Sequence, residues 1–364
     1  MGTWVNRSLS EAESAGQLLA VGIEGTCLSD DLRRGLSRIA PGAVILFARN
    51  LLDASQVAAF CRDLSRAVSV PPFLAIDQEG GRVNRLKGIF PPLPPNLALG
   101  NGPSAIDLVR EHARRTGQGL KSLGFNLNFA PVLDLSMAAS PNGIGDRAYG
   151  SDPDRVALLG GAFLTAQAEE GVLGCGKHFP GLGGGRVDSH EELPRIDANS
   201  DELWNRDLLP YRRLKDVCPL VMVGHAFYPS LQGQPALPAT LSRRVIHDLL
   251  RGRIGYEGLS LTDDLEMGAV DQRRPPGEVT LAAFEAGNDL MMFCKDWGRV
   301  EEAHATLQRA FRTGRYPSSR INASLERVFA AKRRLAPPDA LPPFDADSFQ
   351  EVCRALSQLE HQVA

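Results

Sequence analysis

An aspartate and a histidine lie two residues apart in the segment VDSH. Where the backbone is extended, Asp188 and His190 point to the same side of the chain, because successive side chains of a strand alternate. A carboxylate beside an imidazole fixes the ring tautomer and raises the histidine pKa from its ordinary value of about 6.5. The pair is therefore a candidate proton donor and acceptor near neutral pH. Glu191 and Glu192 are the alternative acids, although adjacent carboxylates before a proline are more typical of solvated positions.

Two consecutive aspartates, Asp263 and Asp264, end the run LSLTDD. Neighbouring side chains of a strand point to opposite sides, so at most one carboxylate faces a site at the end of this strand. One carboxylate nucleophile with a separate proton donor is the minimum set for retaining hydrolysis of a glycosidic bond. Metal binding is the alternative use of paired aspartates. No neighbouring residue has the spacing of a further ligand, so we predict no metal.

Three more residues have the chemistry to hold a polar ligand. Asp77 precedes a Gly-Gly pair that permits a tight turn. Arg85 can therefore fold back, and both side chains can hydrogen-bond neighbouring hydroxyls. Arg147 lies in the glycine-bracketed loop NGIGDRAYG, where its guanidinium can clamp a carbonyl or carboxylate group. The alternative for Arg147 is a surface ion pair with Asp146.

The stretch KHFPGLGGGRVDSH joins two sets of candidate residues. Lys177 and His178 lie at the end of the fifth apolar run, which predicts ligand contacts at a strand end. The glycine-rich residues 181–185 predict a hinge that delivers the aspartate–histidine pair after the ligand has bound, as closing loops do. His225, which follows the run LVMVG, is a further predicted neighbour on the same rim.

Eight short apolar runs alternate with helical patterns, such as the one over residues 53–68. Alternating strands and helices imply parallel pairing, and eight units imply closure into a single α/β barrel, a (β/α)8 TIM-like fold. The uneven spacing leaves an open doubly wound sheet as the alternative. We assign residues 1–335 to the barrel and 336–364 to a short appended segment. The runs are 18–25, 42–49, 72–79, 125–135, 174–180, 220–226, 259–265 and 289–294.

Each run ends in a polar group, and in such barrels the carboxyl ends of the strands form the catalytic face. Charges of both signs are therefore predicted to meet on one rim. The residues are Glu24, Arg49, Asn50, Asp77, Asp134, Lys177, His178, His225, Asp263, Asp264 and Lys295.

The composition limits the classes of partner. The 364 residues are 43% hydrophobic and 23% charged, with a net charge of −3 and no basic stripe, so we predict a globular protein that binds no nucleic acid. Six scattered cysteines without a CxxC pair indicate thiols rather than disulfides or a zinc site. The sequence has neither a signal peptide nor an apolar run of about 18 residues. We expect a cytoplasmic monomer without membrane association.

Several motifs occur in a characteristic order between about residue 15 and residue 335. They are AIDQEGGRVNRL, NLNFAPVLDL, GDRAYG, KHFPG, VDSH, MVGHAFYP and LTDDLEM. In this order they resemble the family-3 glycoside hydrolases, and most closely the bacterial single-domain β-N-acetylglucosaminidases of the NagZ type. The resemblance implies a TIM barrel without cofactor or metal. It also implies a substrate in which N-acetylglucosamine is β-linked to anhydro-N-acetylmuramic acid, as in peptidoglycan recycling.

The resemblance also implies a role for each candidate residue. Asp263 is the nucleophile that forms a covalent glycosyl-enzyme, and His190, oriented by Asp188, is the acid/base. The chain departs from the family pattern at Leu182, where the family has a histidine, and in the Gly-Gly-Arg that follows Gly183. The alternatives are another family-3 specificity, such as a β-glucosidase or a phosphorylase, and a non-catalytic sugar-binding barrel. The sugar-binding residues implied are Asp77, Arg85, Arg147, Lys177, His178 and, less directly, His225.

Overall fold

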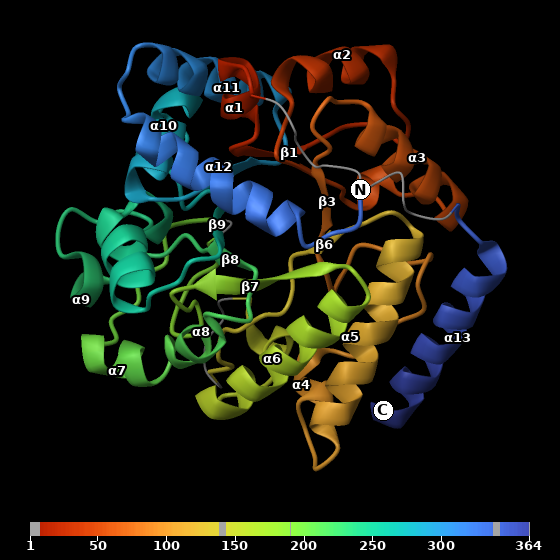
Figure 1. Cartoon of the computed structure of the whole chain (residues 1–364). Coiled ribbons are helices and arrows are strands. Elements are labelled where there is room, and N and C mark those ends of the chain that lie inside the picture. The colour runs from red at the N-terminus through yellow and green to blue at the C-terminus, as the bar shows by residue number, and fades with distance from the viewer. Residues whose placement is uncertain (1–7, 138–142, 190, 338–342, 364) are drawn as a thin grey trace.

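The computed structural model describes residues 8–137, 143–189, 191–337 and 343–363. Eight parallel strands form a closed barrel in the order β1-β10-β9-β8-β7-β6-β3-β2, so that β1 pairs with both β10 and β2 (Figure 1). Each predicted apolar run overlaps one barrel strand. The (β/α)8 prediction is therefore confirmed, and the open-sheet alternative is wrong. The strands are β1 Leu19–Gly22, β2 Ala43–Ile45, β3 Phe73–Ile76, β6 Leu127–Asn128, β7 Leu173–Phe179, β8 Leu220–Val223, β9 Leu259–Asp264 and β10 Leu290–Phe293.

Helices surround the barrel and connect successive strands (Figure 1). A short hairpin of β4 (Gln78–Gly80) and β5 (Val83–Asn84) interrupts the connection after β3. The α-helices are α1 Glu11–Gly16, α2 Asp30–Ile39, α3 Ala54–Arg66, α4 Asn96–Leu99, α5 Ala105–Ser122, α6 Pro153–Glu169, α7 Ser200–Asn205, α8 Leu209–Leu214, α9 Pro229–Gln232, α10 Pro276–Ala286, α11 Trp297–Arg312, α12 Ser318–Lys332 and α13 Ala346–Val363. The 3-10 helices are η1 Ala48–Asn50, η2 Gly145–Arg147 and η3 Ala239–Leu241, and η4 Arg244–Arg253 is a π-helix.

Capping side chains begin the helices α3 and α6. The Asp53 side chain accepts a hydrogen bond from the backbone N–H of Gln56 at the start of α3. Asp152 caps α6 in the same way, and Pro153 occupies the first turn, where its missing N–H has no intrahelical acceptor. The strands β1, β3, β7, β8 and β10 are buried at every position, as expected when helices cover a parallel sheet.

The C-terminal helix α13 lies outside the barrel, beside α5 (Figure 1). Its Phe349 ring packs against Phe90, with 5.8 Å between the ring centroids. The boundary at residue 335 stays a prediction. All six cysteines are free thiols, as predicted. Within the described residues, no helix combines the length and the apolar composition that crossing a bilayer requires.

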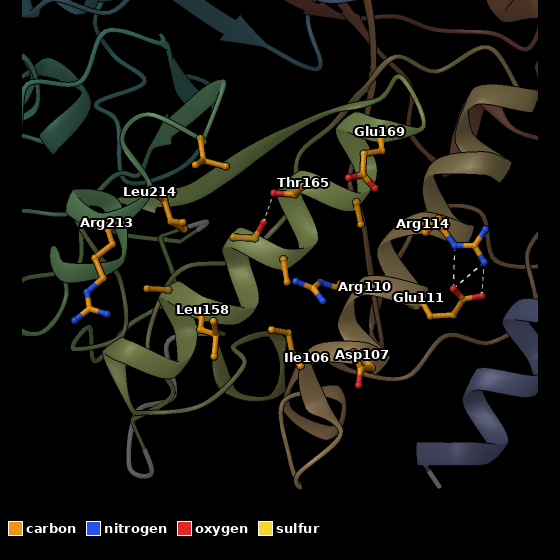
Figure 2. A pocket seen from close by; sticks show the side chains of 15 residues that line it. Ile106, Asp107, Arg110, Glu111, Arg114, Leu158, Thr165, Glu169, Arg213 and Leu214 are labelled. Carbon is orange, nitrogen blue, oxygen red and sulfur yellow. Dashed lines mark hydrogen bonds and ion pairs between the residues drawn. The ribbon is translucent and has the colours of Figure 1, made fainter.

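A cavity of about 810 Å³ is a groove on the outside of the barrel between α5, α6 and α8 (Figure 2). Leu158 and Val217 are exposed there, and Arg110 lies between the two long helices. No predicted site residue lines this groove. The chemistry predicted from the sequence must therefore be sought at the barrel end.

Candidate active site

A cleft of about 370 Å³ opens at the carboxyl ends of the barrel strands. Phe129, Met222 and Met292 supply apolar lining, and charged side chains supply most of the remainder. Seven of the nine predicted site residues line the cleft. These are Asp77, Arg85, Arg147, Lys177, His178, Asp188 and Asp263.

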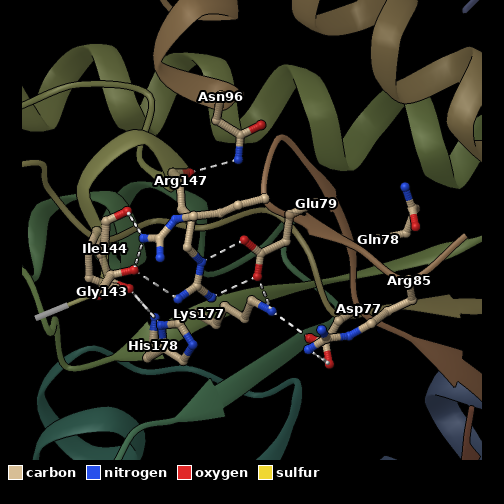
Figure 3. A network of polar contacts seen from close by, with 12 residues as sticks. Asp77, Gln78, Glu79, Arg85, Asn96, Gly143, Ile144, Arg147, Lys177 and His178 are labelled. Atoms are coloured by element: carbon tan, nitrogen blue, oxygen red, sulfur yellow. Dashed lines mark hydrogen bonds and ion pairs between the residues drawn. The ribbon is translucent and has the colours of Figure 1, made fainter. Parts of the chain in front are cut away.

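A buried glutamate that the sequence interpretation missed holds the centre of this cleft together (Figure 3). The carboxylate of Glu79 is 1% exposed and lies 2.6 Å from Lys177 Nζ. It accepts two further hydrogen bonds of 2.8 Å from Arg147 Nε and Nη2. Burial alone would raise the pKa of Glu79, but Lys177 and Arg147 hold it well below its ordinary value. Glu79 is thus an ionised carboxylate between two cations.

Lys177 also donates a hydrogen bond of 2.7 Å to Asp77 Oδ1. Burial would lower the pKa of Lys177, but Asp77 and Glu79 raise it above the ordinary value, so the ammonium group stays charged. Arg85 extends back towards Asp77, as predicted, and its Nη2 lies 3.9 Å from Asp77 Oδ2 (Figure 3). The cleft therefore offers alternating donors and acceptors, which suits a molecule with several hydroxyl groups.

Contacts inside the barrel, rather than an ion pair on the surface, position Arg147. Its backbone carbonyl accepts a hydrogen bond of 2.7 Å from Asn96 Nδ2, and its Nη1 lies 3.4 Å from the carbonyl oxygen of Gly143 (Figure 3). Asp146 pairs with Arg82 Nε at 2.9 Å. The alternative in which Arg147 pairs with Asp146 is therefore wrong, and Arg82 is a cleft residue that the sequence interpretation did not include.

His178 contacts a second carboxylate that was not predicted to belong to the site. Its Nδ1 lies 2.6 Å from Asp134 Oδ2, and its backbone N–H donates to the same oxygen at 3.1 Å. Asp134 was recognised in the sequence only as a polar strand end. Its side chain is fully buried, and the other carboxylate oxygen accepts a hydrogen bond from the backbone N–H of Leu182 at 2.6 Å.

The two aspartates at the end of β9 have different environments. Burial would raise the pKa of Asp263, but the imidazoles of His178 and His225 and the N–H of Asp264 lower it below the ordinary value. Burial, together with Glu266 and Asp263, raises the pKa of Asp264 to about 7. Asp263 is therefore the carboxylate that is ionised at neutral pH.

His225 lies beneath the cleft rather than along it. Its Nδ1 is 2.8 Å from Thr240 Oγ1, and its Nε2 is 2.9 Å from the carbonyl oxygen of Asp264. The ring thus has protein partners at both nitrogens, and it is not among the residues that line the cleft. His225 supports the end of β9, and its direct contact with a ligand stays a prediction.

The loop after β7 brings Asp188 to the mouth of the cleft. A Cβ placed on Gly143 would lie 3.4 Å from Asp188 Oδ2, which shows how closely the two segments approach. The carbonyl of Ser189 accepts a hydrogen bond from the N–H of Ala269 at 3.2 Å. His190, the predicted acid/base, lies outside the described residues, and its role stays a prediction.

The predicted hinge is packed against the barrel in its first half. Gly181, Leu182 and Gly183 are buried, and Tyr228 donates a hydrogen bond of 2.8 Å to the carbonyl of Gly181. A Cβ on Gly183 would lie 2.3 Å from the carbonyl oxygen of Leu135. Any movement of the loop must therefore begin beyond Gly183. In the part of the chain that the structure describes, no group of three or more His, Cys, Asp or Glu side chains is placed to hold a metal ion.

Comparison with known proteins places this geometry in a family. Residues 12–331 match the model of the glycosyl hydrolase family 3 N-terminal domain. A β-hexosaminidase of Pseudomonas aeruginosa is 37% identical over 291 residues, which cover 80% of this chain and 86% of the relative. One of Bordetella parapertussis is 36% identical over 350 residues, covering 93% and 94%.

A solved structure agrees. The family 3 β-N-acetylglucosaminidase of Paenibacillus sp. str. FPU-7 superposes with a TM-score of 0.89 at 35% identity, covering 97% of this chain and 69% of that one. The resemblance predicted from the motifs is confirmed. This chain belongs to glycosyl hydrolase family 3.

Proposed function

We propose that this protein is a retaining β-N-acetylglucosaminidase that releases terminal N-acetylglucosamine through a covalent glycosyl-enzyme. The observation that carries the proposal is an ionised Asp263 that lines a cleft together with the hydrogen-bonded group of Asp77, Glu79, Arg147 and Lys177. The names of the family relatives support the same reaction. Asp77, Arg147, Lys177 and His178 hold the sugar.

The proposed reaction has two steps. An Asp263 oxygen attacks the anomeric carbon while the bond from that carbon to the leaving oxygen breaks, and the predicted donor His190 gives that oxygen a proton. The resulting glycosyl ester is then attacked by water, whose proton returns to His190. Asp188 orients the imidazole and stabilises its protonated form. The sugar leaves with the configuration of the substrate.

The rim of the cleft supports an anionic leaving group, such as the lactyl carboxylate of an anhydro-N-acetylmuramic acid. Besides Arg147 and Lys177, four cations line the cleft: Arg49, Arg82, Arg85 and Lys295. Arg49 and Arg82 are paired with Glu24 and Asp146. Lys295 is exposed and is the best placed to meet a carboxylate. Peptidoglycan fragments are therefore the proposed substrate. The cytoplasmic location and the monomeric state stay predictions.

The reaction is tested with the 4-nitrophenyl β-glycosides of N-acetylglucosamine and glucose, measured side by side, with Asp263→Asn as the inactive control. We expect a preference for the N-acetylglucosaminide, and a mechanism-based fluoroglycoside should add one sugar mass to the peptide that contains Asp263. A preference for the glucoside, or turnover by Asp263→Asn equal to wild type, contradicts the proposal. Release of sugar 1-phosphate in phosphate buffer would identify phosphorolysis instead.

The leaving group is tested separately. Lys295→Met should raise KM for the disaccharide of N-acetylglucosamine and anhydro-N-acetylmuramic acid. It should leave KM for the uncharged 4-nitrophenyl glycoside unchanged, because only the disaccharide carries a carboxylate. An equal change for both substrates would remove the support for an anionic leaving group.

A further inference from the structure

Asp134 occupies a junction between the sugar-binding strand end and the loop that follows it. The segment after β6 runs beside β7, since Val132 pairs with Lys177 and the N–H of Leu133 donates to the Lys177 carbonyl at 2.7 Å. This pairing brings the carboxylate of Asp134 directly behind His178. The side chain is fully buried, so its position is set by the protein and not by solvent.

The two oxygens of this carboxylate have different partners. Oδ2 receives both the backbone N–H and Nδ1 of His178, at 3.1 and 2.6 Å. Oδ1 receives the backbone N–H of Leu182 at 2.6 Å. Among the described residues, His178 is the only side chain that forms an ion pair with Asp134. One buried group thus joins a cleft imidazole to the first turn of the loop.

The contact of Asp134 with Nδ1 determines which ring nitrogen of His178 is available to the cleft. Both oxygens of the Asp134 carboxylate already accept backbone N–H groups, so they act as acceptors and the proton of the contact with His178 belongs to Nδ1. Nε2 is then left to the cleft that His178 lines, as an acceptor for a sugar hydroxyl when the ring is neutral and as a donor when it is protonated. The short distance is typical of a charge-assisted hydrogen bond.

The contact with Leu182 fixes where the loop begins. Tyr228 holds the preceding carbonyl of Gly181, and Gly183 packs on the backbone of Leu135, the residue after Asp134. The loop therefore leaves the barrel from a point that is rigid relative to His178. Asp188 lies six residues after Leu182, so its position depends on where the loop begins.

We propose that Asp134 is a positioning residue that sets the tautomer of His178 and, through the same carboxylate, the starting point of the loop that carries the acid/base pair. The inference rests on the proposed function, because it assigns the imidazole to sugar binding and the loop to proton transfer. Asp134 is not among the residues that line the cleft. It acts through His178 and Leu182.

The test is Asp134→Asn, which keeps the shape of the side chain. An amide has one oxygen, so it cannot accept from both ends, and an NH₂ group must face Nδ1 or the N–H of Leu182. We expect kcat/KM for 4-nitrophenyl β-N-acetylglucosaminide to fall about 10- to 100-fold, the size of effect that a small misplacement of reacting groups produces. The loss in kcat should be larger for an alkyl glycoside, whose poor leaving group depends more on the proton donor.

Asp207→Asn is the matched control. Asp207 is also a buried aspartate, it packs against Gly181, and it pairs with Arg206 at 2.8 Å without contacting His178. Burial raises the pKa of Asp207 to about 6, so the amide resembles a form that the native protein already populates. Its kcat/KM should stay within about twofold of wild type, and its ratio of alkyl to nitrophenyl rates should not change.

Histidine ¹⁵N spectra of the wild-type enzyme provide a test that does not depend on the variant folding. The His178 signal, assigned by its loss in His178→Gln, should have the Nδ1-protonated pattern. The pattern should change in Asp134→Asn and persist in Asp207→Asn. A wild-type ring protonated only at Nε2 overturns the proposal, as does a folded Asp134→Asn enzyme with wild-type kcat/KM. If wild type released no N-acetylglucosamine while the spectra behaved as expected, the proposed function would fail and the tautomer assignment would stand.

Discussion

Replacing Glu79 by glutamine tests whether the centre of the cleft depends on a buried charge. The change keeps the shape of the side chain and removes a carboxylate that three nitrogen atoms of two cations, Lys177 and Arg147, contact at 2.6 to 2.8 Å. The amide oxygen can accept from one cation, but its NH₂ group must then face the other. Lys177 keeps Asp77, whereas Arg147 keeps only the 3.4 Å contact with the Gly143 carbonyl.

The expected loss in the free energy of unfolding follows from the buried cations that lose their carboxylate. Removing one partner of a buried ion pair costs about 3 to 5 kcal/mol, because the remaining charge has been taken out of water without compensation. The side chain of Arg147 is 15% exposed and that of Lys177 is 2% exposed, so solvent relieves little of this cost. We expect Glu79→Gln to lower the free energy of unfolding by about 3 to 5 kcal/mol.

The assay is urea unfolding at pH 7, with Glu285→Gln as control. Glu285 also accepts hydrogen bonds from two side chains, Arg315 and Tyr316, but its own side chain is 45% exposed. An exposed pair contributes about 0.2 to 1 kcal/mol. Equal losses in the two variants would refute the argument that burial makes the difference.

The pH dependence gives a second check on Glu79. Its pKa in the folded protein lies below its ordinary value, so the stabilisation is complete above the unfolded pKa of about 4.3 and is lost as the pH falls further. The difference between wild type and Glu79→Gln should therefore be constant from about pH 5 to neutral pH. A difference that grows with pH above about 6 would point to another titrating group.

Three further predictions concern other sites. Gly183→Ala should lower kcat on alkyl glycosides, because its Cβ would lie 2.3 Å from the carbonyl of Leu135, whereas Gly184→Ala should resemble wild type, since its Cβ would lie no closer than 3.4 Å to another atom. Burial lowers the pKa of Lys332 to about 7. Wild type should therefore gain stability relative to Lys332→Met between about pH 7 and 9, because the unfolded chain binds more protons there. Urea unfolding midpoints that change equally with pH in the two proteins would contradict this. The pH effect of Asp264 has the opposite sign, because its pKa is raised to about 7 in the folded protein. Wild type should therefore lose stability relative to Asp264→Asn from about pH 4 to 7. Parallel pH dependences of the two free energies of unfolding would contradict the raised pKa.

The barrel and most of the cleft residues could be predicted because they have a local signature. An apolar run that ends in a charged residue marks a strand and its carboxyl end. Parallel strands then bring residues as distant as Asp77 and Lys177 to one rim, where they lie 2.7 Å apart. The same signature does not tell which way a side chain turns. His178 and His225 both stand at a strand end, yet the ring nitrogens of His225 contact Thr240 and the Asp264 backbone instead of the cleft.

Glu79 and Asp134 could not be assigned because their partners are remote in sequence. Glu79 lies in the turn DQEGG, where a glutamate is usually solvated. The β4–β5 hairpin turns it inwards to Arg147, which is 68 residues away. Asp134 was visible as a strand end, but only the pairing of its segment with β7 shows that it contacts His178 and Leu182. Long-range pairs of this kind have no periodicity to reveal them.

The two carboxylates that end β9 show how neighbouring residues acquire different charges. Asp263 and Asp264 have the same side chain and both line the cleft. Two imidazoles beside Asp263 lower its pKa, whereas burial and the nearby carboxylates raise that of Asp264 to about 7. Environments that separate the pKa values of paired acids are how active sites assign roles. A nucleophile must be ionised before the sugar arrives, and the position of His178 serves this need as well as sugar binding. A group that orients His178 therefore affects both the ionisation of the nucleophile and the binding of the sugar.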